Sequence, residues 1–355
     1  MIVVVCPGQG SQTPGFLSPW LEAEGVREAL VEYSDAAGVD LIAAGTEWDA
    51  DAIRDTKVAQ PLIVAASLVA WQLLAHHDKV GGVAGHSVGE LAALAAADVI
   101  TAADAMRLVG VRGRAMADAA ALEPTGMSAV LGGDQDAVVA RLTELDLTPA
   151  NYNGGGQIVA AGALEQLAHL AAEPAAGTRV IPLQVAGAFH TRFMQPAVEI
   201  LRTEASTVIS RDPSLPLWSN RDGSEVTSGA SALELLVGQV ANPVRWDLCM
   251  AAFADSGVTG IIELAPAGTL TGLAKRALRG VPSVAVKTPD DLEAAASPLA
   301  AAAAGAPPLC SRPLGPHTRA SSRTVPPVAS CSSPMTNWLA RSTPATSGSA
   351  SAPAS

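Results

Sequence analysis

The sequence predicts an α/β fold in which a main domain built on a parallel sheet carries a small inserted subdomain. Short apolar runs alternate with helical stretches through most of the chain, which is typical of sheets whose strands are joined by helices. Residues 127–186 follow a different order of elements, and the periodic pattern stops near residue 297. The 355 residues are enough for one large domain or two smaller ones.

The main domain begins with a predicted buried strand. Residues 2–8, IVVVCPG, are rich in valine and end at Pro-Gly, which favours a strand followed by a turn. This start has no basic segment and no cleavage site, so we expect no signal peptide. Residues 59–77 have the length and periodicity of a helix, and residues 80–86 predict a second strand of small residues.

Later segments continue the alternation of strands and helices. Residues 88–99 consist of strong helix formers, and residues 103–120 predict another helix. Residues 258–278 predict a strand, a turn with proline and glycine, and a helix. We expect the main domain over residues 1–125 and 187–296.

The intervening residues 126–186 predict a subdomain of their own. Strands are expected at MSAVLGG, LTPANYN, GQIVAAG and TRVIPLQVA, with helices at QDAVVARLTEL and ALEQLAHLAAE. The resulting order β-α-β-β-α-β is the ferredoxin-like arrangement.

Residues 297–355 differ in composition from the rest of the chain. They are mainly Ala, Pro, Ser and Thr, with Trp338 as the one aromatic residue. Such a segment cannot bury enough apolar surface to offset the entropy of ordering it. We therefore expect a disordered tail, and an out-of-frame extension of a GC-rich gene is a sharper hypothesis for the same segment.

The composition excludes several classes of function. A net charge of −12 argues against a nucleic acid partner, and no apolar run is long enough to span a membrane. The four cysteines, Cys6, Cys249, Cys310 and Cys331, have neither metal-binding nor redox spacing. A reduced, cytoplasmic protein without a metal is the simplest interpretation.

Residues 85–89, GHSVG, fit the nucleophile elbow G-x-S-x-G. The tight turn from strand to helix tolerates only small residues beside the serine, and it exposes the hydroxyl of Ser87. It also places the N–H of Val88 at a helix N-terminus, where it can stabilise an oxyanion. The alternative is a chance match, but the predicted strand before and helix after favour a nucleophile in a hydrolase-like main domain.

A serine nucleophile needs a base. His190, in VAGAFHTRF, follows the last strand of the insert and is the best candidate among six histidines. His86 is adjacent to Ser87 but would point away from it on a tight elbow. Acidic residues lie between Ser87 and His190, yet none occupies the recognisable motif that a lipase-like hydrolase would have.

Seven motifs occur in a fixed order along the chain. They are PGQGSQ (7–12), GHSVGE (85–90), VRG (111–113), NYNGGGQIVAAG (151–162), GAFHT (187–191), QVANPVRW (239–246) and KTPDDL (287–292). Together they resemble the malonyl-CoA:acyl carrier protein transacylases of type II fatty acid synthesis, and also the acyltransferase domains of polyketide synthases. The resemblance covers residues 1 to about 296.

The resemblance implies roles for the reacting residues. Ser87 would be the acylated nucleophile, and His190 the general base and then the acid. The backbone carbonyl of Gln239, instead of a carboxylate, would orient His190. The backbone N–H groups of Gln9 and Val88 would form the oxyanion hole.

The resemblance also implies that Arg112 binds the free carboxylate of the malonyl group. A planar guanidinium can hold a carboxylate through two hydrogen bonds, and acetyl would leave the arginine unpaired. Arg107 and Arg114 are the alternatives for this role. The plainer interpretation of Arg112 is an arginine on a solvated helix face, and Arg114 is expected at the surface.

The remaining expected site residues concern the pocket. Phe189 would fill the space that an α-methyl group needs, which suggests malonyl over methylmalonyl. Asn153 and Gln157 are expected to line the pocket near His190. For Glu90 we expect only a favourable carboxylate in the first turn of a helix.

The implied reaction is a ping-pong transfer of malonyl from malonyl-CoA to the phosphopantetheine thiol of acyl carrier protein, without a cofactor. We expect a monomer. Carrier protein is usually acidic, as is this chain, so basic residues are expected to cluster at the mouth of the cleft. The candidates are Arg192, Lys275, Arg276 and Arg279, although a solvated helix end would explain the last three equally well.

Three other readings of the sequence stay open. A thioesterase or esterase would share the elbow, but Arg112 and GQGSQ argue against it. An editing acyl hydrolase or a dedicated polyketide acyltransferase would share the whole fold. A scaffold that binds carrier protein without chemistry would be expected to lack Ser87 or His190, and both are present.

Overall fold

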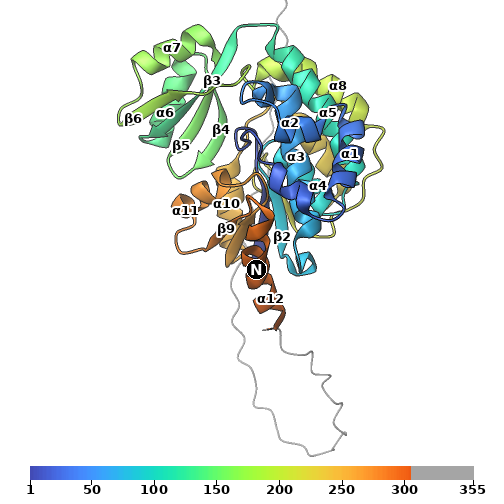
Figure 1. The fold of residues 1–355 in the computed structure, drawn as a ribbon. Coiled ribbons are helices and arrows are strands. Elements are labelled where there is room, and N and C mark those ends of the chain that lie inside the picture. The colour runs from blue at the N-terminus through green and yellow to red at the C-terminus, as the bar shows by residue number, and fades with distance from the viewer. Residues whose placement is uncertain (305–355) are drawn as a thin grey trace, which may run out of the picture. The chain divides into compact units, whose positions relative to one another are not determined.

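A five-stranded parallel sheet forms the larger layer of strands in the computed structural model, which describes residues 1–304, with side chains described up to residue 300 (Figure 1). The strand order is β7-β2-β1-β8-β9, and every pairing is parallel. The strands are β1 (Ile2–Cys6), β2 (Gly82–Gly85), β7 (Leu217–Trp218), β8 (Gly260–Glu263) and β9 (Ser283–Ala285).

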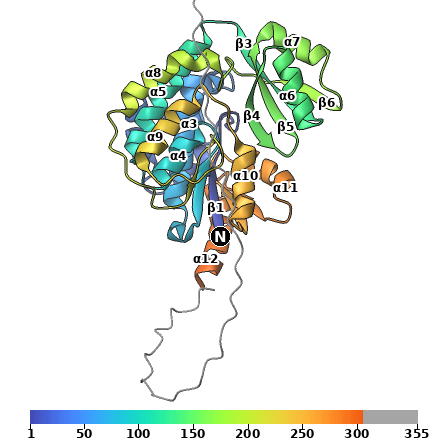
Figure 2. The same ribbon diagram turned by 180° about the vertical axis from the view of Figure 1, so that it is seen from behind.

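Strand β1 is apolar along its whole length because helices cover both faces of this sheet. Val4 belongs to a buried cluster with residues of α3, α4 and α5, whereas Val3 and Val5 belong to a second cluster with residues of α10 and α11. Figure 2 shows these two sets of helices on opposite sides of β1. The helices are α3 (Thr56–Leu73), α4 (Gly89–Ala96), α5 (Ala102–Ala120), α10 (Trp246–Asp255) and α11 (Thr269–Ala277).

Further helices pack around this core. Helix α5 lies against α1, α3 and α8, and α8 contacts α9. These further α-helices are α1 (Val26–Ala37), α2 (Leu41–Thr46), α8 (Gln195–Ala205), α9 (Gly229–Gln239) and α12 (Leu292–Ala304). Short 3-10 helices are η1 (Ser18–Glu22), η2 (Ala52–Arg54), η3 (His77–Lys79), η4 (Arg192–Met194) and η5 (Pro289–Asp291).

A second sheet is antiparallel and has the strand order β4-β5-β3-β6. Its elements follow the chain as β3 (Thr125–Gly132), α6 (Gln135–Glu144), β4 (Thr148–Gly154), β5 (Gln157–Ala163), α7 (Leu164–Ala172) and β6 (Thr178–Pro182). A third buried cluster, which includes Val130, Leu142 and Leu170, packs the two helices onto the sheet. The fold is therefore mixed α/β, with one parallel and one antiparallel sheet.

Strand β4 connects the second sheet to the segment before α10. The N–H of Tyr152 donates to the carbonyl of Val244 at 2.9 Å, and the N–H of Val244 donates to Ala150 at 2.9 Å. These backbone bonds place the segment that follows Gln239 beside β4. The described residues all fall in one compact unit.

The expected end of the periodic pattern near residue 297 is wrong. Helix α12 runs through Ser297 to Ala304. Ala295 and Leu299 are both fully buried and lie one turn apart, so the helix has an apolar seam that the alanine-rich composition conceals. The part of the expected tail beyond residue 304 lies outside the described residues. None of the described helices has the length and apolar character needed to cross a membrane.

Candidate active site

Ser87 lies at a sharp turn between β2 and α4, with φ = 53°, in the left-handed region that residues other than glycine seldom adopt. The two glycines of the motif allow strand and helix to approach. A Cβ atom on Gly85 would lie 2.0 Å from the carbonyl carbon of Gly89, and one on Gly89 would lie 2.2 Å from the carbonyl oxygen of Cys6. Both contacts are with backbone, so neither position can carry a side chain without separating the elements.

His190 faces this serine. Its Nε2 lies 2.7 Å from Ser87 Oγ, and its Nδ1 lies 2.8 Å from the carbonyl oxygen of Gln239. Since the carbonyl can only accept, Nδ1 carries the proton, and Nε2 is free to accept the proton of the serine hydroxyl. Gln239 is the last residue of α9, where helix carbonyls have no partner within the helix.

The protonation state of His190 suits a base. Burial, and to a smaller extent the positive charge of Arg112, lowers the pKa of His190 to about 3. The bond to the Gln239 carbonyl opposes this shift but does not reverse it. The imidazole is therefore neutral at neutral pH, with a lone pair directed at the serine.

Two backbone N–H groups lie on neighbouring loops beside the serine. Cys6 at the end of β1 pairs in register with Gly85 at the end of β2, and Gln9 and Val88 each follow three residues later. Within residues 1–304, neither the N–H of Gln9 nor that of Val88 donates to an acceptor. Val88 is also the N-cap of α4, so its N–H lies at the positive end of that helix.

Arg112 comes from α5 and is buried, with 1% of its surface exposed. Its Nη1 donates to Gln60 Oε1 at 2.7 Å, and its Nη2 donates to Gln239 Oε1 at 2.9 Å. Its Nε has no hydrogen-bond partner among the described residues. Burial lowers the pKa of Arg112 to about 10, while the charge of Glu90 raises it. The guanidinium thus stays charged, and its Nε–H is left without an acceptor among the described residues.

The two alternative arginines lie elsewhere on α5. Arg107 donates to Asp104 at 3.1 Å on the same helix. Arg114 donates to the carbonyl of Ala37 at 2.7 Å. Of the three arginines weighed from sequence, Arg112 is the one that reaches Gln239, the residue that also holds His190.

Asn153 is buried on β4, but it contacts a histidine other than His190. Its Oδ1 lies 2.8 Å from His86 Nε2, and the ring of His86 packs edge-on against Trp246 at 5.7 Å. His86 is thus engaged with β4 and α10, which agrees with its expected orientation away from Ser87. The structure places Asn153 behind the elbow and gives it no hydrogen bond to His190.

Gln157 also has another partner. It begins β5 directly after three glycines with positive φ, so it lies at the tip of the β4–β5 hairpin. Its Oε1 accepts from Arg276 Nη2 on α11 at 3.1 Å. The structure gives Gln157 a hydrogen bond to α11 and none to His190, so its expected place in the pocket stays a prediction.

Phe189 is buried directly before His190, with 6% of its surface exposed. It belongs to the large apolar cluster, which also contains Met116. The sulfur of Met116 lies 3.5 Å from Gln60 Nε2, so this cluster borders the residues that hold Arg112.

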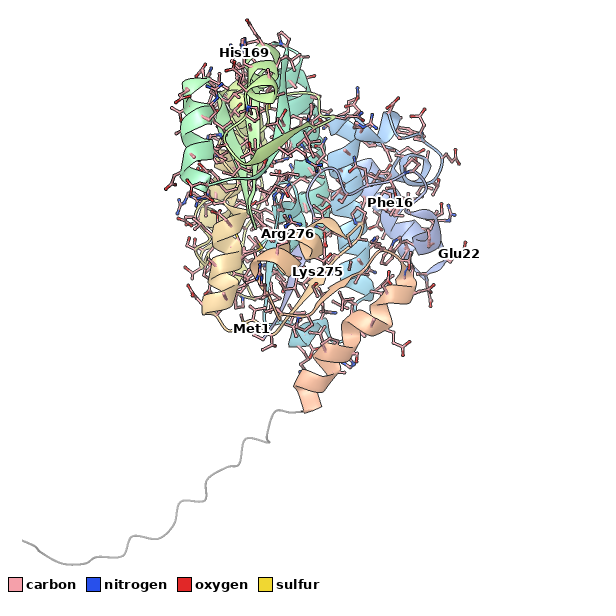
Figure 3. The ribbon with its side chains drawn as sticks, turned by 90° about the vertical axis from the view of Figure 1, so that its left-hand side faces the viewer. Met1, Phe16, Glu22, His169, Lys275 and Arg276 are labelled. Carbon is pink, nitrogen blue, oxygen red and sulfur yellow. The ribbon has the colours of Figure 1, made fainter. Side chains whose placement is uncertain are left out.

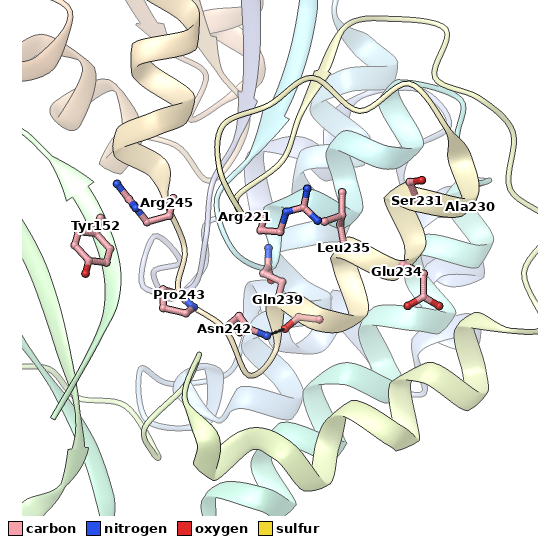
Figure 4. Close-up of a pocket in the computed structure, with 11 residues that line it drawn as sticks. Tyr152, Arg221, Ala230, Ser231, Glu234, Leu235, Gln239, Asn242, Pro243 and Arg245 are labelled. Carbon is pink, nitrogen blue, oxygen red and sulfur yellow. Dashed lines mark hydrogen bonds between the residues drawn. The ribbon is translucent and has the colours of Figure 1, made fainter. Parts of the chain in front are cut away.

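Two cavities adjoin these residues. One of about 340 Å³ contains Gln9 and the segment that leads to His190; its lining includes Gln9, Gly10, Gln12, Ile53, Leu183 and Val185. The other, of about 880 Å³, lies on the Gln239 turn (Figure 4) and is lined by residues that include Tyr152, Arg221, Leu235, Asn242 and Arg245. Neither Ser87 nor His190 lines either cavity. The smaller cavity reaches the loop that carries Gln9, and the larger one reaches Gln239, whose carbonyl holds His190.

A buried polar network joins the elbow to Gln239. Asn220 accepts from the N–H of Ser87 at 2.7 Å and donates to the carbonyl of Gly85 at 2.7 Å. Its own N–H donates to Glu90 Oε1 at 2.6 Å. The amide nitrogen of Gln239 donates to Glu90 Oε2 at 2.5 Å. Side chains thus link Ser87 to Gln239, the residue that contacts both Arg112 and His190.

Comparison with known proteins identifies the family. The acyl transferase domain family matches residues 3–294. The malonyl CoA-acyl carrier protein transacylase of Mycobacterium tuberculosis strain H37Rv is 55% identical over 297 residues, which cover 82% of this chain and 98% of that protein. The chain belongs to the acyl transferase family.

Other relatives agree with this acyltransferase assignment. The transacylase of Escherichia coli strain K12 is 35% identical over 304 residues, covering 82% of this chain and 97% of that protein. A crystal structure of the Mycobacterium tuberculosis enzyme superposes with a TM-score of 0.81 at 54% identity, covering 83% of this chain and 99% of that one. The resemblance to malonyl-CoA:acyl carrier protein transacylases predicted from the motifs is confirmed, and the chain is an acyltransferase.

Two members of the acyltransferase site were missed from sequence. Asn220 follows β7, a strand of only two residues, and has no sequence signal of its own. Glu90 did carry a signal, since it is the one charged residue in the stretch VGELAALAAA. A carboxylate inside an otherwise apolar helix indicates a buried partner more strongly than a favourable helix end. Within residues 1–304, no cluster of His, Cys, Asp or Glu has the arrangement of a metal site.

Proposed function

We propose that this acyltransferase moves a malonyl group from malonyl-CoA to the phosphopantetheine thiol of an acyl carrier protein, through a malonyl ester on Ser87. The observation that carries the proposal is Arg112: a buried, charged guanidinium with an unused Nε donor, joined through Gln239 to the Ser87–His190 pair. A buried cation with a free donor is suited to an acyl group that carries its own carboxylate.

The first half-reaction loads the serine. His190 Nε2 takes the proton of Ser87 as Oγ attacks the thioester carbonyl. The N–H groups of Gln9 and Val88 stabilise the oxyanion, and such a donor is typically worth about 3 kcal/mol. The tetrahedral intermediate collapses by breaking the C–S bond, and the proton on His190 passes to the sulfur of departing CoA.

The second half-reaction returns the enzyme to its starting state. The thiol of the carrier loses its proton to His190 while its sulfur attacks the malonyl ester. The bond between the acyl carbon and Ser87 Oγ breaks, and His190 returns the proton to the serine. No cofactor enters either step, and the Gln239 carbonyl holds the same imidazole tautomer throughout.

The choice between acyl groups is proposed to depend on whether the acyl group supplies a hydrogen-bond acceptor for Arg112. Malonyl presents a carboxylate to Arg112, whereas acetyl offers the buried Nε donor of the guanidinium no acceptor. Phe189 is proposed to limit the space beside the α-carbon and so to disfavour methylmalonyl. Asn153 and Gln157 are proposed to line the pocket near His190 and the substrate, where Asn153 is held by His86 and Gln157 by Arg276.

The partner is proposed to be a carrier protein that docks near α11. Lys275 and Arg276 are exposed side by side at the end of this helix (Figure 3). Arg279 is exposed just beyond it, whereas Arg192 is bound to Asp146 at 2.6 Å. A malonyl transacylase solved in complex with a type II PKS acyl carrier protein has a TM-score of 0.78 at 31% identity, over 84% of this chain and 99% of that one. That likeness supports carriers of polyketide as well as fatty acid synthesis.

The proposal extends to the organisation of the chain. We propose a cytoplasmic monomer with a hydrolase-like main domain, residues 1–125 and 187–296, and a ferredoxin-like subdomain at 126–186. The strand order β4-β5-β3-β6 with two helices on one face supports the subdomain.

Initial-rate kinetics test the function. With malonyl-CoA varied at several fixed concentrations of holo-carrier protein, a ping-pong enzyme gives parallel lines in a double-reciprocal plot. Intersecting lines would contradict the acyl-serine route. Steady hydrolysis of malonyl-CoA that carrier protein does not alter would favour a hydrolase instead.

A further inference from the structure

Glu90 is an acidic residue in an unusual place. It lies in the first turn of α4, three residues after Ser87, and only 7% of its surface is exposed. Both of its oxygens accept hydrogen bonds, one from the N–H of Asn220 and the other from the amide of Gln239. Since both partners are donors, the ionised carboxylate is the form that satisfies them.

The contact with Gln239 decides which way that amide points. Its Nε2 faces Glu90 at 2.5 Å, and its Oε1 faces Arg112 Nη2 at 2.9 Å. If the amide were reversed, an oxygen would meet the carboxylate and an NH₂ group would meet the guanidinium. Both contacts would then be repulsive. Gln239 Nε2 also donates to the carbonyl of Ser87 at 3.0 Å and to Asn220 Oδ1 at 3.2 Å. Glu90 is the charged acceptor among the three and lies nearest, so it contributes most to holding Gln239 in the orientation that receives Arg112.

Gln239 therefore serves the site twice. Its backbone carbonyl orients His190, and its side chain orients Arg112. The first of these contacts does not depend on Glu90, because it comes from the free carbonyl at the end of α9. A glutamine in place of Glu90 keeps an oxygen for the N–H of Asn220, the residue that holds Ser87, so it should disturb the arginine while leaving the serine and histidine in place.

We propose that Glu90 is a positioning residue for acyl selection, which fixes the Gln239 amide and thereby aims Arg112 at the carboxylate of the acyl group. This inference rests on the proposed function. It assigns no contact between Glu90 and the substrate.

The charged and titratable surroundings of Glu90 are few. Arg112 faces it from α5, and Cys249 lies near it on α10. Burial raises the pKa of Cys249, so that thiol stays neutral at neutral pH. Burial raises the pKa of Glu90 to about 7, while Asn220, Arg112 and Gln239 oppose the shift. Glu90 thus loses its second acceptor oxygen as the pH falls through this range.

The Glu90→Gln variant tests the proposal with a side chain of the same shape. The new NH₂ group would face a donor, and Gln239 would turn to relieve the clash. We expect kcat/KM for malonyl-CoA to fall by roughly 10- to 100-fold, as for a buried donor left without its partner. The value for acetyl-CoA should change far less, so the preference for malonyl should fall. The matched control is Glu234→Gln, on the exposed face of α9, which should leave the preference unchanged.

Two further readouts separate positioning from general damage. The rate at which phenylmethylsulfonyl fluoride modifies Ser87 should stay close to the wild-type value in Glu90→Gln, because His190 keeps its carbonyl. The malonyl preference of the wild type should fall as the pH drops through about 7, whereas that of Glu90→Gln should be flat. A double variant with Gln239→Met should show no greater loss of preference than the poorer single variant, since both act through one contact.

An unchanged malonyl preference in Glu90→Gln would overturn the proposal. An increased preference would also overturn it, because it would show that the negative charge of Glu90 repels the carboxylate of the malonyl group. Equal losses for malonyl and acetyl, with a matching loss of sulfonyl fluoride reactivity, would also overturn it. Failure of the proposed function is distinguishable, because the wild type itself would then show no preference for malonyl-CoA.

Discussion

The reacting residues are held in backbone conformations that they would not adopt freely. Ser87 has φ = 53° and His190 has φ = 62°, and such left-handed residues cost about 1–3 kcal/mol each. The side-chain amide of Asn220 stabilises the elbow locally, since it accepts from the N–H of Ser87 and donates to the carbonyl of Gly85. The strain directs Oγ and Nε2 toward each other at 2.7 Å before any substrate is present.

The low pKa of His190 leads to a prediction about pH. Because burial lowers this pKa to about 3, the imidazole stays neutral far below the range in which a solvated histidine is protonated. The rate of Ser87 modification by phenylmethylsulfonyl fluoride should therefore be nearly constant from about pH 8 to about pH 5. This neutral reagent needs no contact with Arg112, so the measurement avoids the separate effect of pH on Glu90. A decline with a midpoint near that of an ordinary histidine would show that the base is not buried as described.

The site residues that sequence reasoning found are those whose signal is local. Ser87 lies in a five-residue motif, and Arg112 and His190 lie in motifs of the same ordered set. Asn220 and the side chain of Gln239 act on Ser87 from segments more than a hundred residues away, and no local pattern encodes those contacts. The bond between Gln157 and Arg276 is also made across a long separation in sequence, and no local pattern encodes it.

The packing of secondary-structure elements shapes the elbow, since β1, β2 and α4 approach one another closely there. Gly89 begins α4 and packs directly on the backbone at the end of β1. The order of strands and helices could be predicted from the alternation of small apolar runs with helix formers. The end of α12 could not be predicted from the sequence. Its alanine residues favour a helix, but they do not show which face of that helix is buried.

Gly89→Ala tests this packing. The new Cβ would lie 2.2 Å from the carbonyl oxygen of Cys6, so the helix must move away from the sheet. We expect the free energy of unfolding to fall by about 3 kcal/mol, measured by urea denaturation. Gly272→Ala in α11 is the control, since no atom lies within 4 Å of its added Cβ. That variant should be neutral or more stable by about 0.5 kcal/mol. Equal stability of the two variants would show that the elbow tolerates a side chain.

The net charge of the whole molecule opposes the proposed partner. A chain of net charge −12 repels an acidic carrier, so binding must rely on a local excess of positive charge. Lys275, Arg276 and Arg279 provide one at the end of α11. Part of Arg276 is already used by Gln157, which leaves its guanidinium anchored on the β4–β5 hairpin.

Charge reversal tests this docking site. The variant Lys275→Glu/Arg276→Glu should raise the KM for carrier protein by roughly tenfold at low salt, and less at high salt. The KM for malonyl-CoA should stay the same. Arg202→Glu/Arg211→Glu changes the net charge equally on α8 and the loop that follows it, and it should have little effect. A similar rise in both variants would mean that overall charge, and not α11, governs the encounter.

The central claim is that Ser87 carries a malonyl group selected by Arg112, and intact-protein mass spectrometry tests it most directly. Wild type, Ser87→Ala and Arg112→Met are each mixed with malonyl-CoA or acetyl-CoA without carrier protein. The account predicts one malonyl adduct on the wild type, none on Ser87→Ala, and about 100-fold slower malonyl loading on Arg112→Met without a comparable loss for acetyl. An adduct that survives Ser87→Ala, or a malonyl preference that survives Arg112→Met, would contradict it.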